Sequence, residues 1–130
     1  MKFDDSKHLL NFEEMDSYHK DFVNIYNSLE NDSSEAYKNV MLKILEQTRL
    51  HFCNEEELMQ KYNYPRLKEH SDEHKKVLYE MEYFINGANT KIGRNILKSY
   101  FLEGLPNWFD THLLSMDSDL SSFLKEKTNL

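Results

Sequence analysis

Cysteine, proline and glycine are all scarce in this 130-residue chain, which contains one, two and three of them respectively. The single cysteine, Cys53, excludes an internal disulfide bond and fits a reducing compartment. Because few glycines and prolines interrupt the chain, long stretches can stay regular, and apolar residues recur in them at helical spacing rather than in alternation. The sequence therefore predicts an all-α fold, and its length predicts a single domain covering residues 1–130.

The chain also lacks long apolar runs and an excess of positive charge. No segment approaches the ~20 apolar residues that span a bilayer, and the first residues lack the apolar centre of a signal peptide. We therefore expect a cytoplasmic protein with no membrane partner. The formal net charge of −7 also disfavours nucleic acid and anionic membrane surfaces as partners, because both attract basic faces.

Apolar residues at helical spacing predict helices over residues 13–29, 34–62, 66–85 and 92–123. Ser33 or Ser34 can cap the second helix, and Gly87 is expected to cap the end of the third. Four helices with short connections predict an antiparallel up-down-up-down four-helix bundle.

Gly104 and Pro106 are expected to break or kink the last helix, because proline in a helix interior removes a hydrogen bond and clashes with the preceding turn. A restart with Pro106 in the first turn is the preferred arrangement, since proline is tolerated there.

The most informative pattern lies between residues 51 and 74, which contain a His51-x-x-x-Glu55 pair and a His70-x-x-x-His74 pair. Residues four apart on an α-helix are only ~40° apart around the axis and ~6 Å along it, so both members of a pair can reach one metal ion. This spacing is therefore the one that a helix needs to present two ligands together.

Polar residues recur on or near the predicted core faces of all four helices. They are His19, His51, Glu55, His70, His74, His112 and Asp117. Burying a carboxylate or an imidazole without a partner is costly, and metal ions would offset that cost. Seven ligands exceed what one ion usually takes, so the pattern indicates two ions. Imidazole and carboxylate ligands without thiolate favour iron or manganese, and zinc less well.

Each element alone has an ordinary explanation. A single His-x-x-x-His pair is usually solvated or hydrogen-bonded, His19 alone is most often a capping or core histidine, and Glu55 opens an acidic run of the kind that usually faces solvent. Their combination on four predicted helices at compatible depths favours the metal site. His8 differs because it precedes the first helix in a charged segment, and we expect it at the surface.

The order of these residues resembles that of the hemerythrin family, in particular its single-domain bacterial members. The matching motifs are Met15-Asp16-x-x-His19-Lys20, His51-Phe52-x-x-Glu55-Glu56-x-x-Met59, Tyr64-Pro65 before His70-x-x-x-His74, and Trp108-x-x-x-His112-Leu113-x-x-x-Asp117. The resemblance covers nearly the whole chain. Three features depart from the family pattern: Tyr18 stands where glutamine is usual, Phe109 where leucine is common, and Gly104 and Pro106 where the family usually has a continuous helix.

The resemblance implies a non-heme di-iron centre with two unequal ions and an oxo or hydroxo bridge. One iron would be bound by His70, His74 and His112, and the other by His19 and His51. Glu55 and Asp117 would bridge both. The first iron would then be full, and the second would keep one open position for dioxygen.

The residues that follow or precede the ligands suggest an apolar wall for that position. The candidates are Phe52, Trp108, Phe109 and Leu113. The spacing between His112 and Asp117 is unusual, because five residues correspond to ~140° around an ideal α-helix. Either the helix loosens near Ser115, or the two side chains reach the site from different sides.

The resemblance implies reversible dioxygen binding, for oxygen transport, storage or sensing, and no enzymatic activity. Two alternatives stay open. One is a di-iron oxidase, peroxidase or nitric oxide scavenger, which would need a proton donor beside the open ion. The other is an iron-dependent interaction module. We expect a monomer and leave oligomerisation open.

Overall fold

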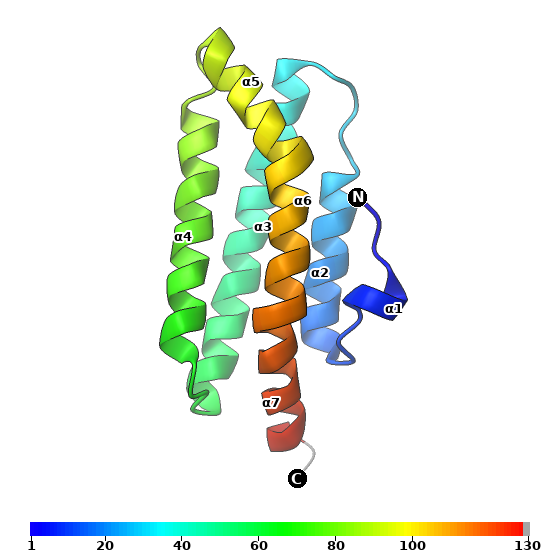
Figure 1. The fold of residues 1–130 in the computed structure, drawn as a ribbon, viewed down its shortest axis with the longest axis vertical. Coiled ribbons are helices and arrows are strands. Elements are labelled where there is room, and N and C mark those ends of the chain that lie inside the picture. The colour runs from blue at the N-terminus through cyan, green and yellow to red at the C-terminus, as the bar shows by residue number, and fades with distance from the viewer. Residues whose placement is uncertain (129–130) are drawn as a thin grey trace.

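The fold is an antiparallel helical bundle, which confirms the predicted fold class (Figure 1). The computed structural model describes residues 1–128. The first three arms of the bundle are the helices α2 (Glu13–Tyr26), α3 (Ser34–Lys61) and α4 (Leu67–Asn86), and the short helix α1 (Asp5–His8) precedes them. The fourth and last arm consists of α5 (Lys91–Ser99), η1 (Tyr100–Gly104), α6 (Leu105–His112), η2 (Leu113–Asp117) and α7 (Ser118–Thr128).

The predicted limits of the first three long helices agree with the structure to within a few residues. The first ends at Tyr26 rather than near residue 29, because the chain turns at Asn27. Ser33 is the N-cap of α3, and its hydroxyl accepts a hydrogen bond from the amide of Ala36 at 3.1 Å. Gly87 ends α4 as expected, but in a right-handed conformation with φ −77°. Its conformational freedom is therefore not needed there.

The predicted break in the last arm is wrong in one respect. Gly104 keeps helical dihedral angles (φ −66°, ψ −46°), so the chain does not leave the helix there. Instead η1 is a π-helical turn, in which the amide of Leu105 bonds to the carbonyl of Tyr100, five residues earlier. Pro106 does lie in the first turn of α6, as expected. The wide turn accommodates the proline without a break.

A second π-helical turn, η2, resolves the spacing between His112 and Asp117. The amide of Ser118 bonds to the carbonyl of Leu113, again five residues back. The helix therefore loosens around Ser115, the first of the two predicted arrangements, and His112 and Asp117 come to the same side of the helix. Without this turn their side chains would diverge.

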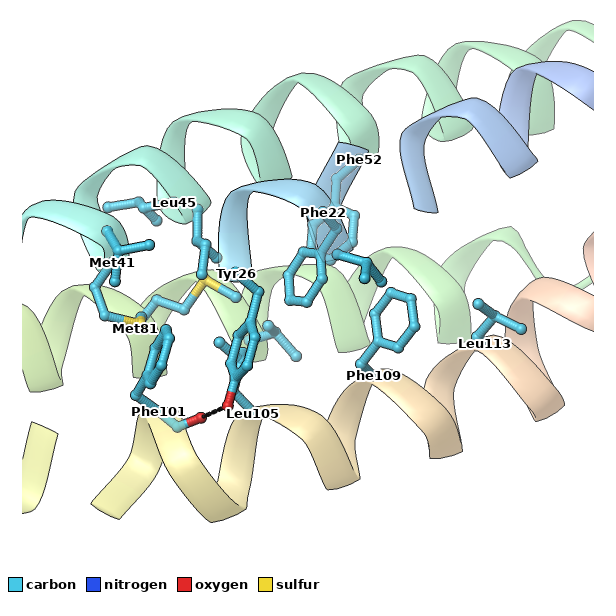
Figure 2. Packing of buried hydrophobic residues seen from close by; sticks show 14 of the residues in the cluster. Phe22, Tyr26, Met41, Leu45, Phe52, Met81, Phe101, Leu105, Phe109 and Leu113 are labelled. Carbon is cyan, nitrogen blue, oxygen red and sulfur yellow. Dashed lines mark hydrogen bonds between the residues drawn. The ribbon is translucent and has the colours of Figure 1, made fainter. Parts of the chain in front are cut away.

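Apolar side chains from all four arms fill the space between the helices on one side of the polar cluster (Figure 2). Met41, Met81 and Leu105 are fully buried there. Phe101 stacks on Tyr26 with 4.2 Å between the ring centroids. This packing fixes the spacing of the helices that carry the polar residues.

The prediction that His8 lies at the surface is wrong, since only 4% of the residue is exposed. Its Nε2 lies 2.8 Å from Oδ1 of Asp110, and its Nδ1 accepts a hydrogen bond from the amide of Asp4 at 3.0 Å. Lys7 adds an ion pair of 2.9 Å to the same Asp110. These contacts attach the N-terminal arm, residues 1–12, to α6.

Within residues 1–128, none of the helices combines the length and the apolar character that crossing a bilayer requires. Cys53 is exposed on α3.

Candidate metal centre

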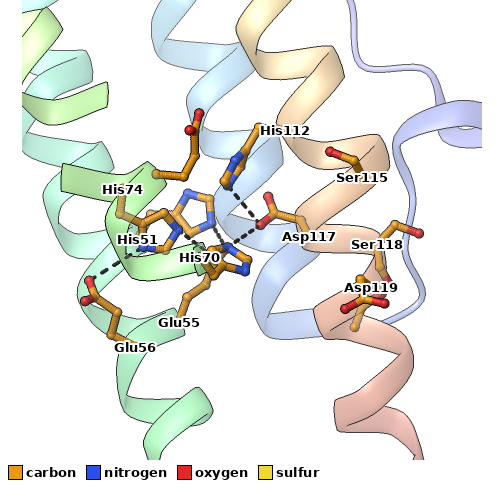
Figure 3. Close-up of polar contacts among 12 residues, drawn as sticks. His51, Glu55, Glu56, His70, His74, His112, Ser115, Asp117, Ser118 and Asp119 are labelled. Atoms are coloured by element: carbon orange, nitrogen blue, oxygen red, sulfur yellow. Dashed lines mark hydrogen bonds and ion pairs between the residues drawn. The ribbon is translucent and has the colours of Figure 1, made fainter. Parts of the chain in front are cut away.

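Seven buried polar side chains from all four arms of the bundle meet in its interior. α2 supplies His19, α3 supplies His51 and Glu55, α4 supplies His70 and His74, and the last arm supplies His112 and Asp117. None is more than 4% exposed. These are the seven residues selected from the sequence, and Figure 3 shows six of them converging between the helices.

The seven residues form two groups whose ligand atoms lie within 4.8 Å of one another. One group contains His70, His74 and His112, and the other contains His19 and His51. Glu55 and Asp117 belong to both groups.

Glu55 divides its two carboxylate oxygens between the groups. Oε1 lies 3.0 Å from Nε2 of His70 and 3.1 Å from Nε2 of His74. Oε2 contacts Nε2 of His51, its partner one helical turn earlier on α3. A carboxylate that offers one oxygen to each group could bridge two ions.

Asp117 repeats this division from the opposite side of the cluster. Its Oδ1 lies 3.2 Å from Nε2 of His70 and also 3.2 Å from Nε2 of His112. Its Oδ2 lies 2.9 Å from Nε2 of His19. All five imidazoles therefore present Nε2 to the centre, and both carboxylates face both groups.

The three-histidine group satisfies a test for a bound cation. Among the described residues, five of its atoms are buried without a hydrogen bond of suitable geometry: Glu55 Oε1, Asp117 Oδ1 and Nε2 of His70, His74 and His112. Leaving one buried polar atom unpaired costs about 1–3 kcal/mol, and five converging atoms multiply that cost. A divalent ion with a preference for nitrogen and oxygen ligands would pair all five, so the residues present fit a metal ion.

The electrostatics of the cluster keep its carboxylates ionised. Burial raises the pKa of Asp117, but the imidazoles of His112, His19 and His70 outweigh burial, so the pKa lies well below its usual value. For Glu55, burial and the nearby Asp117 raise the pKa, but the opposite effect of His51 and His70 is larger, so the pKa lies well below its usual value. The cluster therefore holds two negative charges in a buried place.

Protons and metal ions compete for the same imidazoles. Burial lowers the pKa of His70, but its contacts with Asp117 and Glu55 raise it to about 9. Metal ligation requires the neutral imidazole, so a metal ion would displace this proton.

Aromatic rings fix the planes of three imidazoles. Phe52 stacks on His74 with 3.7 Å between centroids and 5° between planes. Trp108 stacks on His112 at 5.0 Å and 21°. Tyr18 stacks on His51 at 5.1 Å and 6°. Tyr18, which stands where the hemerythrin pattern usually has glutamine, therefore stacks directly on a member of the two-histidine group.

The four wall residues chosen from the sequence do not all lie beside the two-histidine group. Phe109 does, because its ring meets His19 edge-on at 6.0 Å. Phe52 borders His51 as well as His74, whereas Trp108 covers His112 on the three-histidine side. Leu113 is buried in the same apolar cluster.

Sequence reasoning missed two neighbours of the site. Phe22 stacks on Phe109 at 4.8 Å and so completes the wall near His19. Its position three residues after His19 on one helix face was the available signal. Glu56 lies 3.6 Å from Nδ1 of His74, and its place in an acidic run concealed it.

Comparison with known proteins agrees with this geometry. The model of the hemerythrin HHE cation binding domain matches residues 10–124. A bacteriohemerythrin from Ralstonia nicotianae is 24% identical over 115 residues, which cover 86% of this chain and 80% of that protein. No solved structure matches the chain. Since the family model spans all four arms and every candidate ligand, the chain belongs to the hemerythrin HHE cation-binding family.

Proposed function

We propose that this protein binds dioxygen reversibly at a non-heme di-iron centre. The observation that carries the proposal is the unequal division of five imidazoles around two shared carboxylates. One iron would have no free coordination position, because its ligands would be His70, His74, His112, both carboxylates and an oxo or hydroxo bridge. His19 and His51 with the same bridges would leave a position free on the other. Two ferrous ions held in this way would supply the electrons that dioxygen accepts on binding.

The surroundings of the two-histidine group suit binding without turnover. Phe22 and Phe109 stack beside His19, and His8 from the N-terminal arm meets the ring of Phe109 at 5.6 Å. Apolar rings exclude water, and a dry site protects bound oxygen from protons that would release it as peroxide. The proposed role is therefore an oxygen carrier, store or sensor rather than an enzyme.

The test is metal analysis combined with an optical spectrum of the anaerobically reduced protein, before and after exposure to air. We expect two irons per chain, and a visible band that forms with oxygen and disappears when oxygen is removed. A ferrous protein that gives no band, or that loses it at once with release of free peroxide, would contradict the proposal.

One observation favours an oxidase, peroxidase or nitric oxide scavenger as the second candidate. The ring of Tyr18 lies against His51, and its phenol is the kind of group that can donate a proton. Sustained consumption of peroxide or nitric oxide with a reductant, reduced in Tyr18→Phe, would replace the binding function by this one.

A further inference from the structure

His74 is restrained on three sides of its ring. Its face stacks on Phe52, and its Nε2 points to Glu55 in the metal centre. Its other nitrogen, Nδ1, points away from the centre and lies 3.6 Å from Oε2 of Glu56 (Figure 3). The ring therefore has a carboxylate beside each nitrogen.

Glu56 is itself held by the helix that carries His74. The hydroxyl of Ser71 donates a hydrogen bond of 2.6 Å to Oε1 of Glu56, which leaves Oε2 directed at the imidazole. Ser71 precedes His74 by three residues on α4, so both lie on one face of the helix. The side chain of Glu56 is 32% exposed, whereas Glu55 beside it is fully buried.

The other imidazoles lack such a partner. Nδ1 of His19, His70, His74 and His112 is buried without a hydrogen bond among the described residues, and of these four only Nδ1 of His74 is in an ion pair with a carboxylate. Of the ion pairs within residues 1–128 that involve the five ligand imidazoles, the contact between His74 and Glu56 alone uses Nδ1.

An imidazole that binds a metal ion through Nε2 carries its proton on Nδ1. A carboxylate that accepts this proton in a hydrogen bond fixes the tautomer, holds the ring plane and makes Nε2 a stronger donor to the ion. The present separation of 3.6 Å exceeds a hydrogen bond, but rotation of a partly exposed side chain can close it.

We propose that Glu56 is a positioning residue for the ion of the three-histidine group. It accepts the Nδ1 proton of His74, and Ser71 orients it for that task. This inference rests on the proposed metal centre, and it concerns metal affinity rather than oxygen binding.

The first test measures ferrous iron affinity without oxygen, by competition with a chromogenic chelator. Glu56→Ala is expected to weaken binding of one of the two ions by about 10–100-fold, the usual effect of losing such a partner. Ser71→Ala should weaken it less, because Glu56 loses its orientation only. Glu56→Gln should restore most of the affinity, since the amide oxygen still accepts the proton. Glu57→Ala, an exposed neighbour in the same acidic run, is the matched control and should match wild type.

The second test observes the proton itself, by nitrogen-15 NMR of the zinc-loaded protein. The His74 Nδ1 proton should exchange slowly in wild type and in Glu56→Gln, and rapidly in Glu56→Ala. Loss of packing alone would not change one imidazole proton selectively.

Unchanged iron affinity in both Glu56→Ala and Ser71→Ala would overturn the proposal, as would an unchanged His74 signal. If Glu56→Ala does not fold, the iron affinity of Ser71→Ala and the exchange rate of the His74 Nδ1 proton in Ser71→Ala decide the matter. Neither test uses oxygen, so a missing oxygen band would overturn the proposed function and leave this result intact.

Discussion

The hydroxyl of Tyr26 occupies a place that a backbone amide would fill in a regular π-helical turn. In η1 the carbonyl of Phe101 would accept its hydrogen bond from residue 106, which is proline and has no N–H. Tyr26 donates to that carbonyl instead, at 2.8 Å (Figure 2). One side chain thus compensates for a proline on another helix.

Tyr26→Phe should therefore lower the free energy of unfolding by about 1–3 kcal/mol, because a buried carbonyl loses its donor. The loss should be smaller when Pro106→Ala is also present, since alanine restores an N–H at residue 106. Chemical denaturation of the two single variants and the double variant measures this coupling. Tyr37→Phe is the control for loss of a tyrosine hydroxyl, because this hydroxyl bonds to Asp32 near the surface rather than to a carbonyl of η1. Strictly additive losses would contradict this account.

Variants of single residues can distinguish a proposed ligand of one ion from a proposed ligand of both ions. His19 serves one group, whereas Asp117 serves both. His19→Ala should lose one ion of the pair, and Asp117→Ala should reduce binding of both. Anaerobic iron analysis after gel filtration measures the outcome, with the exposed neighbour Lys20→Ala as control. Equal iron content in the His19 and Asp117 variants would argue against bridging.

Among the elements, the N-terminal arm packs on the wall of the two-histidine group, where the proposed open position would lie. His8 packs on Phe109, and Phe109 meets His19. The arm therefore forms an outer layer over the wall of the two-histidine group. It is held by Asp110 and by Asp16, whose Oδ1 accepts a hydrogen bond from the amide of Leu10 at 2.7 Å.

Removal of residues 1–9 should expose Phe109 and speed access of water and small anions to the site. We expect azide to bind the oxidised iron protein several-fold faster, and the oxygenated form to decay faster, with iron content unchanged. Stopped-flow spectroscopy measures both rates. Lys2→Ala, an exposed change in the same arm, should alter neither rate. Equal rates in the truncated and full-length proteins would show that ligands use another route.

Local patterns predicted the helices well and selected the polar residues that the fold brings together, because these patterns rely on neighbours a few residues away. The capping by Ser33 and the pairs His51-Glu55 and His70-His74 are of this kind. The burial of His8 depends on Asp110, 102 positions later in the chain, and no local pattern contains that contact. The π-helical turn η1 was also not predicted, whereas the spacing of His112 and Asp117 had left the loosening at η2 as one of two alternatives.

At the scale of the whole molecule, metal binding and folding should be linked. Iron in the proposed centre would pair with two buried carboxylates and five buried imidazoles, and its removal would leave unpaired buried charge, which opposes folding. The metal-free protein should melt at lower temperature. Free ferrous iron at 100 times its Kd should stabilise the fold by about 2.7 kcal/mol per site. Anaerobic thermal denaturation measures this, with Mg²⁺ as control because it prefers oxygen ligands. Identical melting with and without iron would contradict the linkage.

Alkaline stability should depend on buried tyrosines. A hydrogen bond to Asp32 raises the pKa of Tyr37 to about 12, and burial raises the pKa values of Tyr26 and Tyr100 above the usual value of 10.0. A raised pKa means that the folded state favours the protonated form. The stabilisation is therefore complete below pH 10.0 and is lost as the pH rises toward about 12. Apart from the exposed Tyr79 and Tyr83, which can ionise in the folded protein, tyrosinate absorbance should rise together with the loss of helical circular dichroism. Ionisation of all eight tyrosines without unfolding would contradict this.

The exposed thiol of Cys53 has a practical consequence for every experiment in air. It follows Phe52 on α3 but lies on the outside of the bundle, where a second molecule can reach it. Exposed thiols oxidise and can join two chains covalently. A dimer that forms on aeration and dissolves with a thiol reductant would be an artefact of storage. Cys53→Ser would therefore give the cleaner starting material for oxygen titrations and mass measurements.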